Sequence, residues 1–158
     1  MRTVLQDRLD DTGDVLGAIR AADRLAHRVP AAHAATVCVA ALDPTDGTLT
    51  WCSAGHPPPL VVNADFARYL PLSGSGPLGT GADYRLGTDR LEPNDMVLLY
   101  SDGIIERPGR GPAAATVELS QVAIDSVARR GLDPALSAAE RASTPTLELL
   151  VRQSGHTG

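Results

Sequence analysis

Apolar residues recur at helical spacing near the start of the chain. Within residues 14–28 the charged side chains of Arg20, Asp23 and Arg24 fall largely on one side of a helical projection. Four apolar residues fall on the other side, namely Val15, Ile19, Ala22 and Ala26. This spacing predicts an amphipathic helix that ends before Pro30.

Between residues 36 and 100 the pattern changes to short runs of β-forming residues. Six such runs are predicted to be strands, at residues 36–42, 48–53, 60–62, 66–70, 84–87 and 96–100. Turn-forming residues separate them, as in Asp43-Pro44-Thr45-Asp46-Gly47. Short strands joined by such turns predict an antiparallel β-meander.

Helical composition returns after a loop at residues 108–112. Residues 117–129 and 133–153 are predicted helices; Pro145 interrupts the second, and Gly155 is placed to end it. Helices, then a block of strands, then helices are typical of an α+β fold, here an antiparallel β-meander flanked by helices.

Composition narrows the possible functions. The chain has 158 residues, of which 43% are hydrophobic and 21% charged, as expected for one globular domain with its own core. It has no apolar run long enough to span a membrane and no signal-peptide pattern, so we expect a cytoplasmic protein. With a net charge of −5, scattered arginines and few aromatic residues, the sequence indicates no basic stripe and no nucleic-acid binding.

Two cysteines are too few for a zinc cluster. If residues 43–47 form the loop of a hairpin, Leu42 pairs with Thr48, and Cys38 pairs directly with Cys52. This register predicts two adjacent thiols, which the cytosol would keep reduced. The alternative is that both are ordinary core thiols.

The segment Met-Val-Leu-Leu-Tyr-Ser-Asp-Gly, residues 96–103, carries the most informative candidate chemistry. An apolar run leads to Asp102 on a tight Ser-Asp-Gly turn. A strand that ends in this way holds a carboxylate on rigid backbone, and Gly103 would let a ligand or a second metal approach. Alone, an Asp-Gly pair after a strand is usually a structural turn.

Four motifs in order strengthen the metal interpretation. They lie at residues 36–49, at 54–60 (Ala-Gly-His-Pro-Pro-Pro-Leu), at 76–79 (Gly-Pro-Leu-Gly) and at 91–106. Their order and spacing resemble the SpoIIE/RsbU-type branch of the metal-dependent serine/threonine protein phosphatases (PPM, or protein phosphatase 2C-like). The resemblance implies a PPM-type α-β-β-α sandwich, formed by residues 1–158 as one domain that is incomplete at both ends.

The same resemblance implies a chemistry. Members of this family use two or more Mn²⁺ or Mg²⁺ ions to activate a water that attacks phosphoserine or phosphothreonine directly. Asp102 matches a metal-ligand position of the family, and Gly103 is assigned to the same metal site. A lone carboxylate cannot hold a pair of divalent ions, so further acidic ligands are required.

The family takes its further ligands from two acidic patterns that this sequence lacks. One is an N-terminal Gly-Gly-Asp-x-x-Asp, and the other is an Asp-Asp pair before the last strand. Near the N-terminus, acidic residues are explained by helix capping and the helix dipole; they are Asp7, Asp10, Asp11 and Asp14. Residues 146–158 resemble the family's last helix and the following turn; alternatively, residues 147–152 are the final strand.

Other motif residues are candidates for lining the site. Glu106 lies three residues beyond Gly103 and either reaches the site or solvates a loop. Gly55 and His56 form a motif turn, for which we favour a structural role in shaping the site wall over ligation by His56. Residues 72–79, which end in Gly79, are glycine-rich but lack the Gly-Lys-Ser/Thr ending of a phosphate loop, and a mobile flap beside the site is expected.

These observations leave three hypotheses for function. The first is a protein serine/threonine phosphatase domain whose substrate, by family resemblance, is a phosphoprotein such as a STAS-type anti-anti-sigma factor. The second is a non-catalytic, partner-binding or regulatory remnant of such a phosphatase. The third is an obligate subunit whose exposed sheet edge is completed by another chain.

Overall fold

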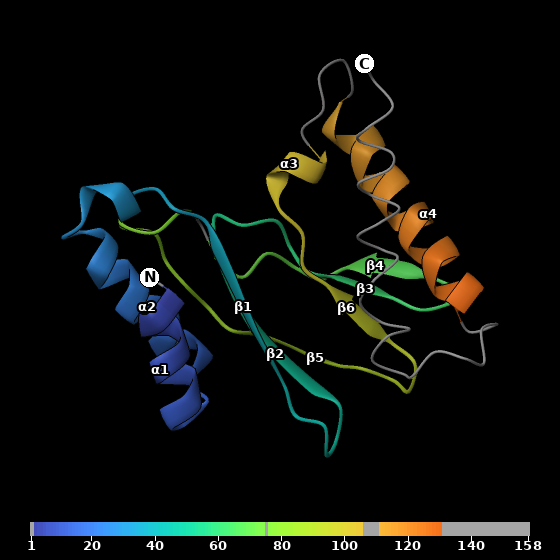
Figure 1. The fold of residues 1–158 in the computed structure, drawn as a ribbon, viewed down its shortest axis with the longest axis horizontal. Coiled ribbons are helices and arrows are strands. Elements are labelled where there is room, and N and C mark those ends of the chain that lie inside the picture. Colours follow the sequence, from blue (N-terminus) through green and yellow to red (C-terminus); the bar gives the residue numbers. More distant parts are fainter. Residues whose placement is uncertain (1, 75, 106–110, 131–158) are drawn as a thin grey trace. The chain divides into compact units, whose positions relative to one another are not determined.

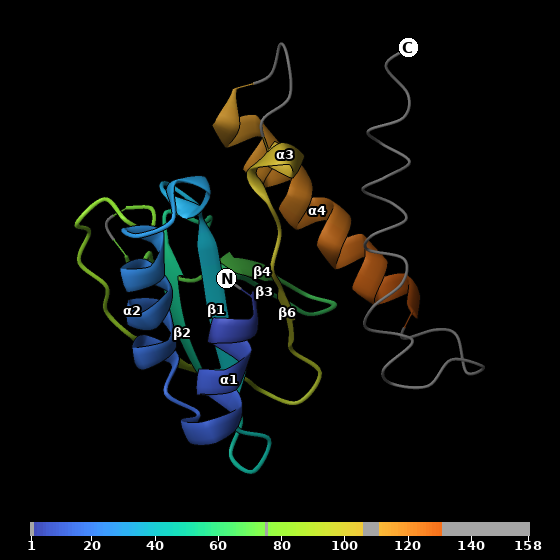
Figure 2. The same ribbon diagram turned by 60° about the vertical axis from the view of Figure 1, so that its left-hand side comes forward.

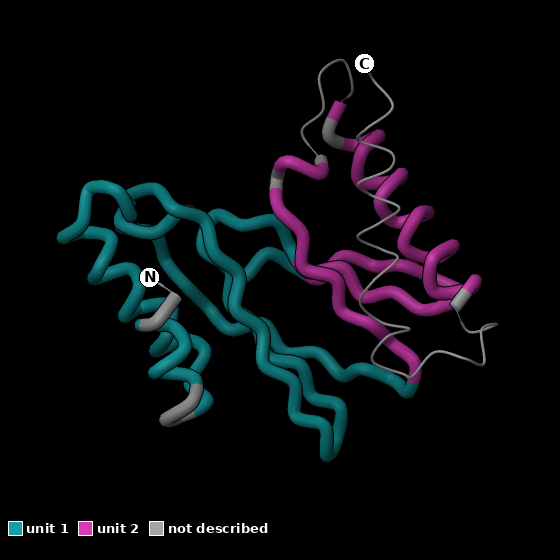
Figure 3. The backbone as a smooth tube through the Cα atoms, viewed as in Figure 1, with its two compact units in different colours: residues 1–58, 71–93 teal, residues 59–70, 94–158 magenta. Residues whose placement is uncertain are grey.

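The chain folds into two compact units. The computed structural model describes residues 2–74, 76–105 and 111–130. Unit 1 comprises Met1–Pro58 and Pro71–Pro93, and unit 2 comprises Pro59–Leu70 and Asn94–Gly158 (Figure 3). The helix predicted at residues 133–153, with Pro145 and Gly155, lies outside the described residues.

Unit 1 combines two helices with a three-stranded antiparallel sheet (Figure 1). The sheet has the order β1-β2-β5, with β1 at Val37–Leu42, β2 at Thr48–Ala54 and β5 at Gly87–Arg90. The helices are α1 (Arg2–Thr12) and α2 (Val15–Ala26), and a short 3-10 turn, η1, spans Pro30–Ala32. Strand β5 pairs with β2 although two other strands lie between them in the sequence.

Helix α2 matches the predicted amphipathic helix. Asp14 is its N-cap, and the Asp14 side chain accepts a hydrogen bond from the backbone N–H of Gly17 (2.9 Å). The buried face of α2 consists of Val15, Ala18, Ile19, Ala22 and Ala26. These side chains share a core with Val39 of β1 and with Cys52 and Ala54 of β2, and Figure 2 shows α2 beside these strands. Burial of one apolar face therefore fixes α2 on the sheet.

Helix α1 was not predicted, and it changes the interpretation of the N-terminal acids. Asp7, Asp10 and Asp11 lie within α1, whose first turn contains no acidic residue. Capping and dipole effects at a helix start therefore apply to Asp14 and not to these three residues. The sequence of α1 has a weak apolar stripe, in which Leu5 and Leu9 are partly buried against the unit 1 core.

The β1–β2 hairpin differs from its predicted register by one residue. The backbone N–H of Asp43 donates to the oxygen of Thr48 (2.8 Å), and that of Gly47 donates to the oxygen of Asp43 (2.9 Å). Gly47 has a positive φ of 77°. The loop thus spans four residues rather than five, and Leu42 pairs with Leu49.

This shift separates the two cysteines. Cys38 pairs with Ser53, and Cys52 pairs with Val39. Because neighbouring residues of a strand point to opposite faces, the two side chains lie on opposite faces of the sheet. The prediction of adjacent thiols is therefore wrong. Both cysteines are free; Cys52 is buried and Cys38 is half-buried.

We expect the two thiols not to couple within a monomer. Burial raises the pKa of Cys38 to about 11, and it also raises the pKa of Cys52. At pH 8 about one Cys38 thiol in a thousand would be ionised, so alkylation of the folded protein should be slow. Thiol titration before and after mild oxidation, with Cys38→Ser as the control, measures this. An intramolecular disulfide in the folded monomer would contradict the observed register.

The position predicted for strand β5 was also wrong. The predicted strand covered residues 84–87, whereas β5 spans Gly87–Arg90. Tyr84 instead forms an isolated bridge with Gly74, and its ring is buried in the unit 1 core. Gly87 is required at the start of β5, because a Cβ at this position would collide with the indole ring of Trp51.

Unit 2 packs a long helix on a second antiparallel sheet. The sheet has the order β4-β3-β6, formed by Ala67–Tyr69, Leu60–Val62 and Met96–Leu98. Helix α3 spans Asp102–Ile105, and helix α4 spans Pro112–Arg130, so α4 begins five residues earlier than predicted. Pro112 fits there because the first residue of a helix needs no bonded N–H. The core joins Leu119, Val122 and Ala123 of α4 to Leu60, Val62 and Tyr100.

The predicted α+β class with antiparallel strands flanked by helices is confirmed. The strands divide between two sheets, in which only β1–β2 and β3–β4 pair as neighbours in sequence. Within the described part of the chain, no helix is long and apolar enough to cross a membrane.

Candidate functional site

Asp102 and Gly103 lie at the start of a short helix, a few residues after a half-buried strand. Strand β6 ends at Leu98, and Asp102 is the first residue of α3. The backbone N–H of Ile104 donates to the oxygen of Ser101 (3.0 Å), so the predicted tight turn is the first turn of a helix. Gly103 is exposed, and among the described residues a Cβ there would meet only Ser101 Oγ, at 3.8 Å. The described residues therefore leave space beside Gly103.

The described residues do not by themselves fit a two-metal centre. Among them, no group of three or more His, Cys, Asp or Glu side chains comes close enough to hold an ion. Hard divalent cations need several oxygen ligands, so one carboxylate near α3 is insufficient. Glu106, the other acidic candidate of this segment, lies outside the described residues.

The motif turn at Gly55 and His56 packs against the second glycine motif. Gly55 follows β2 with a positive φ of 63°, and a Cβ there would stand 2.8 Å from the backbone nitrogen of Pro77. Only glycine fits this combination of conformation and close contact. The motifs at residues 54–60 and 76–79, recognised separately in the sequence, thus meet through Gly55 and Pro77 of unit 1.

His56 is engaged in the backbone of its own turn. Its Nδ1 lies 3.0 Å from the oxygen of Pro57, and the His56 oxygen accepts a hydrogen bond from Ser53 Oγ (2.7 Å). Because a carbonyl oxygen can only accept, we assign the ring proton to Nδ1, which leaves Nε2 as the acceptor of the neutral ring. These contacts favour the structural role that was predicted for His56.

Gly79 is held against α2 instead of lying on a free loop. It is buried with a φ of 77°, and its backbone N–H donates to Asp23 Oδ1 (2.8 Å). The preceding Leu78 is fully buried, and its N–H donates to the oxygen of Ala35 (2.9 Å). This anchoring argues against the predicted mobile flap for residues 77–79.

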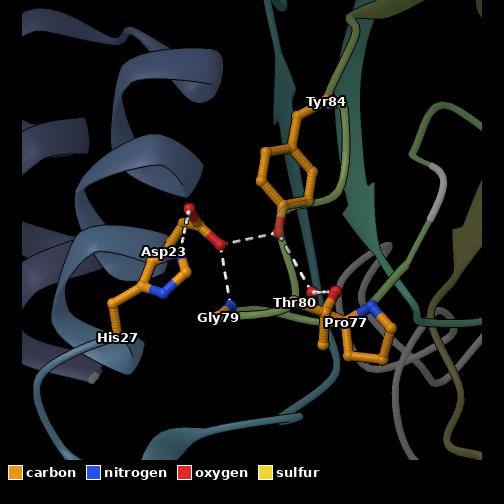
Figure 4. A network of polar contacts seen from close by, with 6 residues as sticks. All are labelled: Asp23, His27, Pro77, Gly79, Thr80 and Tyr84. Atoms are coloured by element: carbon orange, nitrogen blue, oxygen red, sulfur yellow. Dashed lines mark hydrogen bonds and ion pairs between the residues drawn. The ribbon is translucent and has the colours of Figure 1, made fainter.

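Asp23 is the centre of a polar network that joins α2 to the motif loop (Figure 4). Its Oδ1 accepts from the hydroxyl of Tyr84 (2.8 Å) as well as from Gly79 N–H. Its Oδ2 lies 3.6 Å from Nε2 of His27. The oxygen of Pro77 accepts from Thr80 Oγ1 (2.7 Å) and lies 3.1 Å from the Tyr84 hydroxyl. One carboxylate thus fixes two segments of the loop to the helix.

The Tyr84 hydroxyl has two acceptors and only one proton. Asp23 Oδ1 and the Pro77 oxygen both lie within hydrogen-bond distance of it. Burial, followed by the hydrogen bond to Asp23, raises the pKa of Tyr84 well above its usual value. The phenol therefore stays protonated and acts as a donor to this network.

The sequence analysis placed Asp23 on the polar side of its helix, and this was wrong. The Asp23 side chain is only 19% exposed and faces the loop. Asp23 follows Ile19 by four residues and Ala22 by one, so helical spacing puts it at the border of the apolar face. A lone carboxylate at the border of an apolar face could have suggested a buried polar contact. Its partners could not be identified, because they lie more than fifty residues away in the sequence.

The candidate residues therefore fall into two groups. Gly55, His56 and Gly79 belong to unit 1, whereas Asp102 and Gly103 belong to unit 2. Within unit 1, the two glycine motifs meet at Pro77, and Asp23 binds the second motif through the N–H of Gly79.

Comparison with known families gives a match over most of the chain. The family model described as Stage II sporulation protein E (SpoIIE) matches residues 1–144. The region matched includes both sheets and all the motif residues discussed above.

Solved structures show the same fold. The crystal structure of the RsbU and RsbW domains of Rv1364c from Mycobacterium tuberculosis is 41% identical, with a TM-score of 0.82. It matches 96% of this chain, which spans only 41% of that chain. The phosphatase domain of the cell fate determinant SpoIIE from Bacillus subtilis, presoaked with Mn, is 17% identical with a TM-score of 0.57. That match covers 98% of this chain and 66% of the other.

Proposed function

Because the chain belongs to the SpoIIE family, we propose that residues 1–158 constitute one phosphatase domain that hydrolyses phosphoserine or phosphothreonine in a protein substrate. The observation that carries this proposal is the family match over residues 1–144. The shared fold of the B. subtilis phosphatase domain supports it. Both units contribute motif residues, which is why we treat them as parts of one functional domain.

The proposed cofactor is Mn²⁺ or Mg²⁺, with Asp102 as a metal ligand and Gly103 beside it. Support comes from the family resemblance and from the Mn-presoaked state of the B. subtilis domain. The described residues offer no three-ligand group, so a complete centre requires carboxylates beyond them. In this proposal Gly55, His56 and Gly79 shape the wall of the site, and Glu106 lines it.

The proposed substrate belongs to an anti-sigma pathway. The M. tuberculosis relative carries an RsbU and an RsbW domain in one structure, which supports such a context for this chain. A STAS-type anti-anti-sigma factor, phosphorylated on serine or threonine in the cytoplasm, is the substrate that this context and the family resemblance favour.

Phosphate release from a phosphorylated STAS-domain protein tests the proposal. We expect turnover by the full chain with Mn²⁺ and none with EDTA. Asp102→Asn should lower turnover by at least roughly 10- to 100-fold, the loss caused even by outer partners of metal ligands. Asp65→Asn, a change at an exposed loop carboxylate of unit 2, is the matched control and should keep full activity. Equal turnover in both variants would remove Asp102 from the site.

A second candidate function is that of a non-catalytic regulatory domain. Two observations favour it: the sequence lacks both further acidic patterns of the family, and the described residues hold no three-ligand group. In that case the chain would bind the phosphorylated STAS-domain protein without releasing phosphate. Binding measured by calorimetry, together with absent turnover in Mn²⁺, would establish this function in place of the first.

A further inference from the structure

Three arginines form a basic ridge along the exposed side of α2. Arg20, Arg24 and Arg28 follow one another at intervals of four residues, and all three are exposed. The helical turn continues past the end of α2, because the backbone N–H of Val29 donates to the oxygen of Leu25 (3.0 Å). Residues four apart lie one above the other on a helix, so the ridge extends for about 12 Å.

No carboxylate neutralises this ridge within the described residues. Asp23 of α2 forms an ion pair with His27. Among the described residues, no acidic side chain forms an ion pair with Arg20, Arg24 or Arg28. Asp23 is the acidic residue within α2, and Gly79 and Tyr84 occupy its Oδ1. The polar network that anchors the motif loop thus directs this carboxylate toward the loop, and among the described residues its ion pair is with His27 and not with an arginine of the ridge.

The helix itself does not account for all three positive charges. A basic residue in the last turn, such as Arg24, interacts favourably with the negative end of the helix dipole. Arg20 lies near the middle of α2, where this effect is lost, and like charges four residues apart repel each other. The chain has 19 acidic residues and a net charge of −5, so this local concentration of positive charge runs against its overall composition.

We propose that the ridge of Arg20, Arg24 and Arg28 is a docking surface for an acidic helical segment of a partner protein. Carboxylates placed one per turn on such a segment would match the arginines, whose planar guanidinium groups pair well with carboxylates. The short ridge and the negative charge of the whole chain disfavour long polyanions such as duplex DNA or anionic membranes. The sequence analysis missed this ridge because it treated the arginines as scattered.

Binding of a designed peptide to the full chain tests this surface independently of phosphatase activity. The probe is a fluorescent alanine-based helical peptide with three glutamates at intervals of four residues, and a peptide with glutamines in their place is its control. The test variant carries Arg20→Gln, Arg24→Gln and Arg28→Gln, since glutamine keeps helix propensity. The matched control removes three exposed arginines elsewhere, by Arg85→Gln, Arg90→Gln and Arg129→Gln.

We expect the glutamate peptide to bind at low salt and to weaken at about 0.3 M salt. The α2 variant should bind it about tenfold more weakly, as three exposed ion pairs would give, whereas the control variant should change little. Equal loss in both variants, or no binding by the unchanged chain, would overturn the proposal. Tighter ridge-dependent binding of duplex DNA or of phosphatidylserine vesicles would overturn the choice of a protein partner.

Discussion

Replacing Gly55 with alanine is expected to destabilise unit 1 by about 3 kcal/mol, the sum of backbone strain and overpacking. Gly55 has a φ of 63°, and a Cβ there would stand 2.8 Å from the nitrogen and 3.0 Å from the Cα of Pro77. These are backbone atoms, so no side-chain rotation relieves the contact. To relieve this contact, the two glycine motifs that meet here would have to move apart.

The single tryptophan of the chain makes this prediction measurable in unit 1 alone. Trp51 lies in β2 and is buried, so its fluorescence during urea unfolding follows the sheet next to Gly55. Gly81→Ala is the matched control, because Gly81 has a φ of 76° and no atom of the described residues lies within 4 Å of an added Cβ. The control should lose only about 1 kcal/mol from backbone strain. Equal losses in the two variants would show that contact with Pro77 contributes nothing.

Local periodicity was sufficient to predict the elements whose burial is one-sided. Helix α2 was predicted because Val15, Ile19, Ala22 and Ala26 bury one stripe, and the structure confirms this. Strand β5 was misplaced because Tyr84 is a β-forming residue, whereas its ring fills the core beneath α2. Tertiary packing thus overrode strand propensity at this position.

The register error at the first hairpin has a different cause. Asp43 closes the loop through its backbone with Thr48, a choice between a four- and a five-residue loop that turn composition does not decide. A register shift of one residue was enough to place Cys38 and Cys52 on opposite faces of the sheet. Register depends on hydrogen bonds that the sequence does not display.

The candidate site could be predicted only as far as its motifs reach. Gly55 and Gly79 were found because they lie in motifs that resemble the family pattern, and both have positive φ in the structure. Asp23 escaped because its partners, Gly79 and Tyr84, are distant in the sequence. The roles of Asp102 and Gly103 in metal binding stay predictions.

Replacing Asp23 with alanine is expected to destabilise unit 1 by about 1 to 3 kcal/mol, because a buried N–H loses its acceptor. The Gly79 N–H would be left without a partner, whereas the Tyr84 hydroxyl could still donate to the oxygen of Pro77. Asp23→Asn keeps an accepting oxygen and should cost markedly less. Urea unfolding followed by Trp51 fluorescence, with hydrogen exchange of the Gly79 amide, measures both. Unchanged Gly79 exchange in Asp23→Ala would contradict the anchoring role.

The same network predicts a loss of stability at alkaline pH that depends on Tyr84. Its pKa is raised in the folded protein, so the unfolded chain releases the phenol proton first, near pH 10. The contribution to stability is therefore complete below about pH 10 and falls as the pH rises above that value. Tyr84→Phe removes this proton but leaves the Asp23–Gly79 bond, so its unfolding free energy should fall less steeply above about pH 10. Parallel pH profiles in the two proteins would show that Tyr84 titrates alike in the folded and unfolded chains.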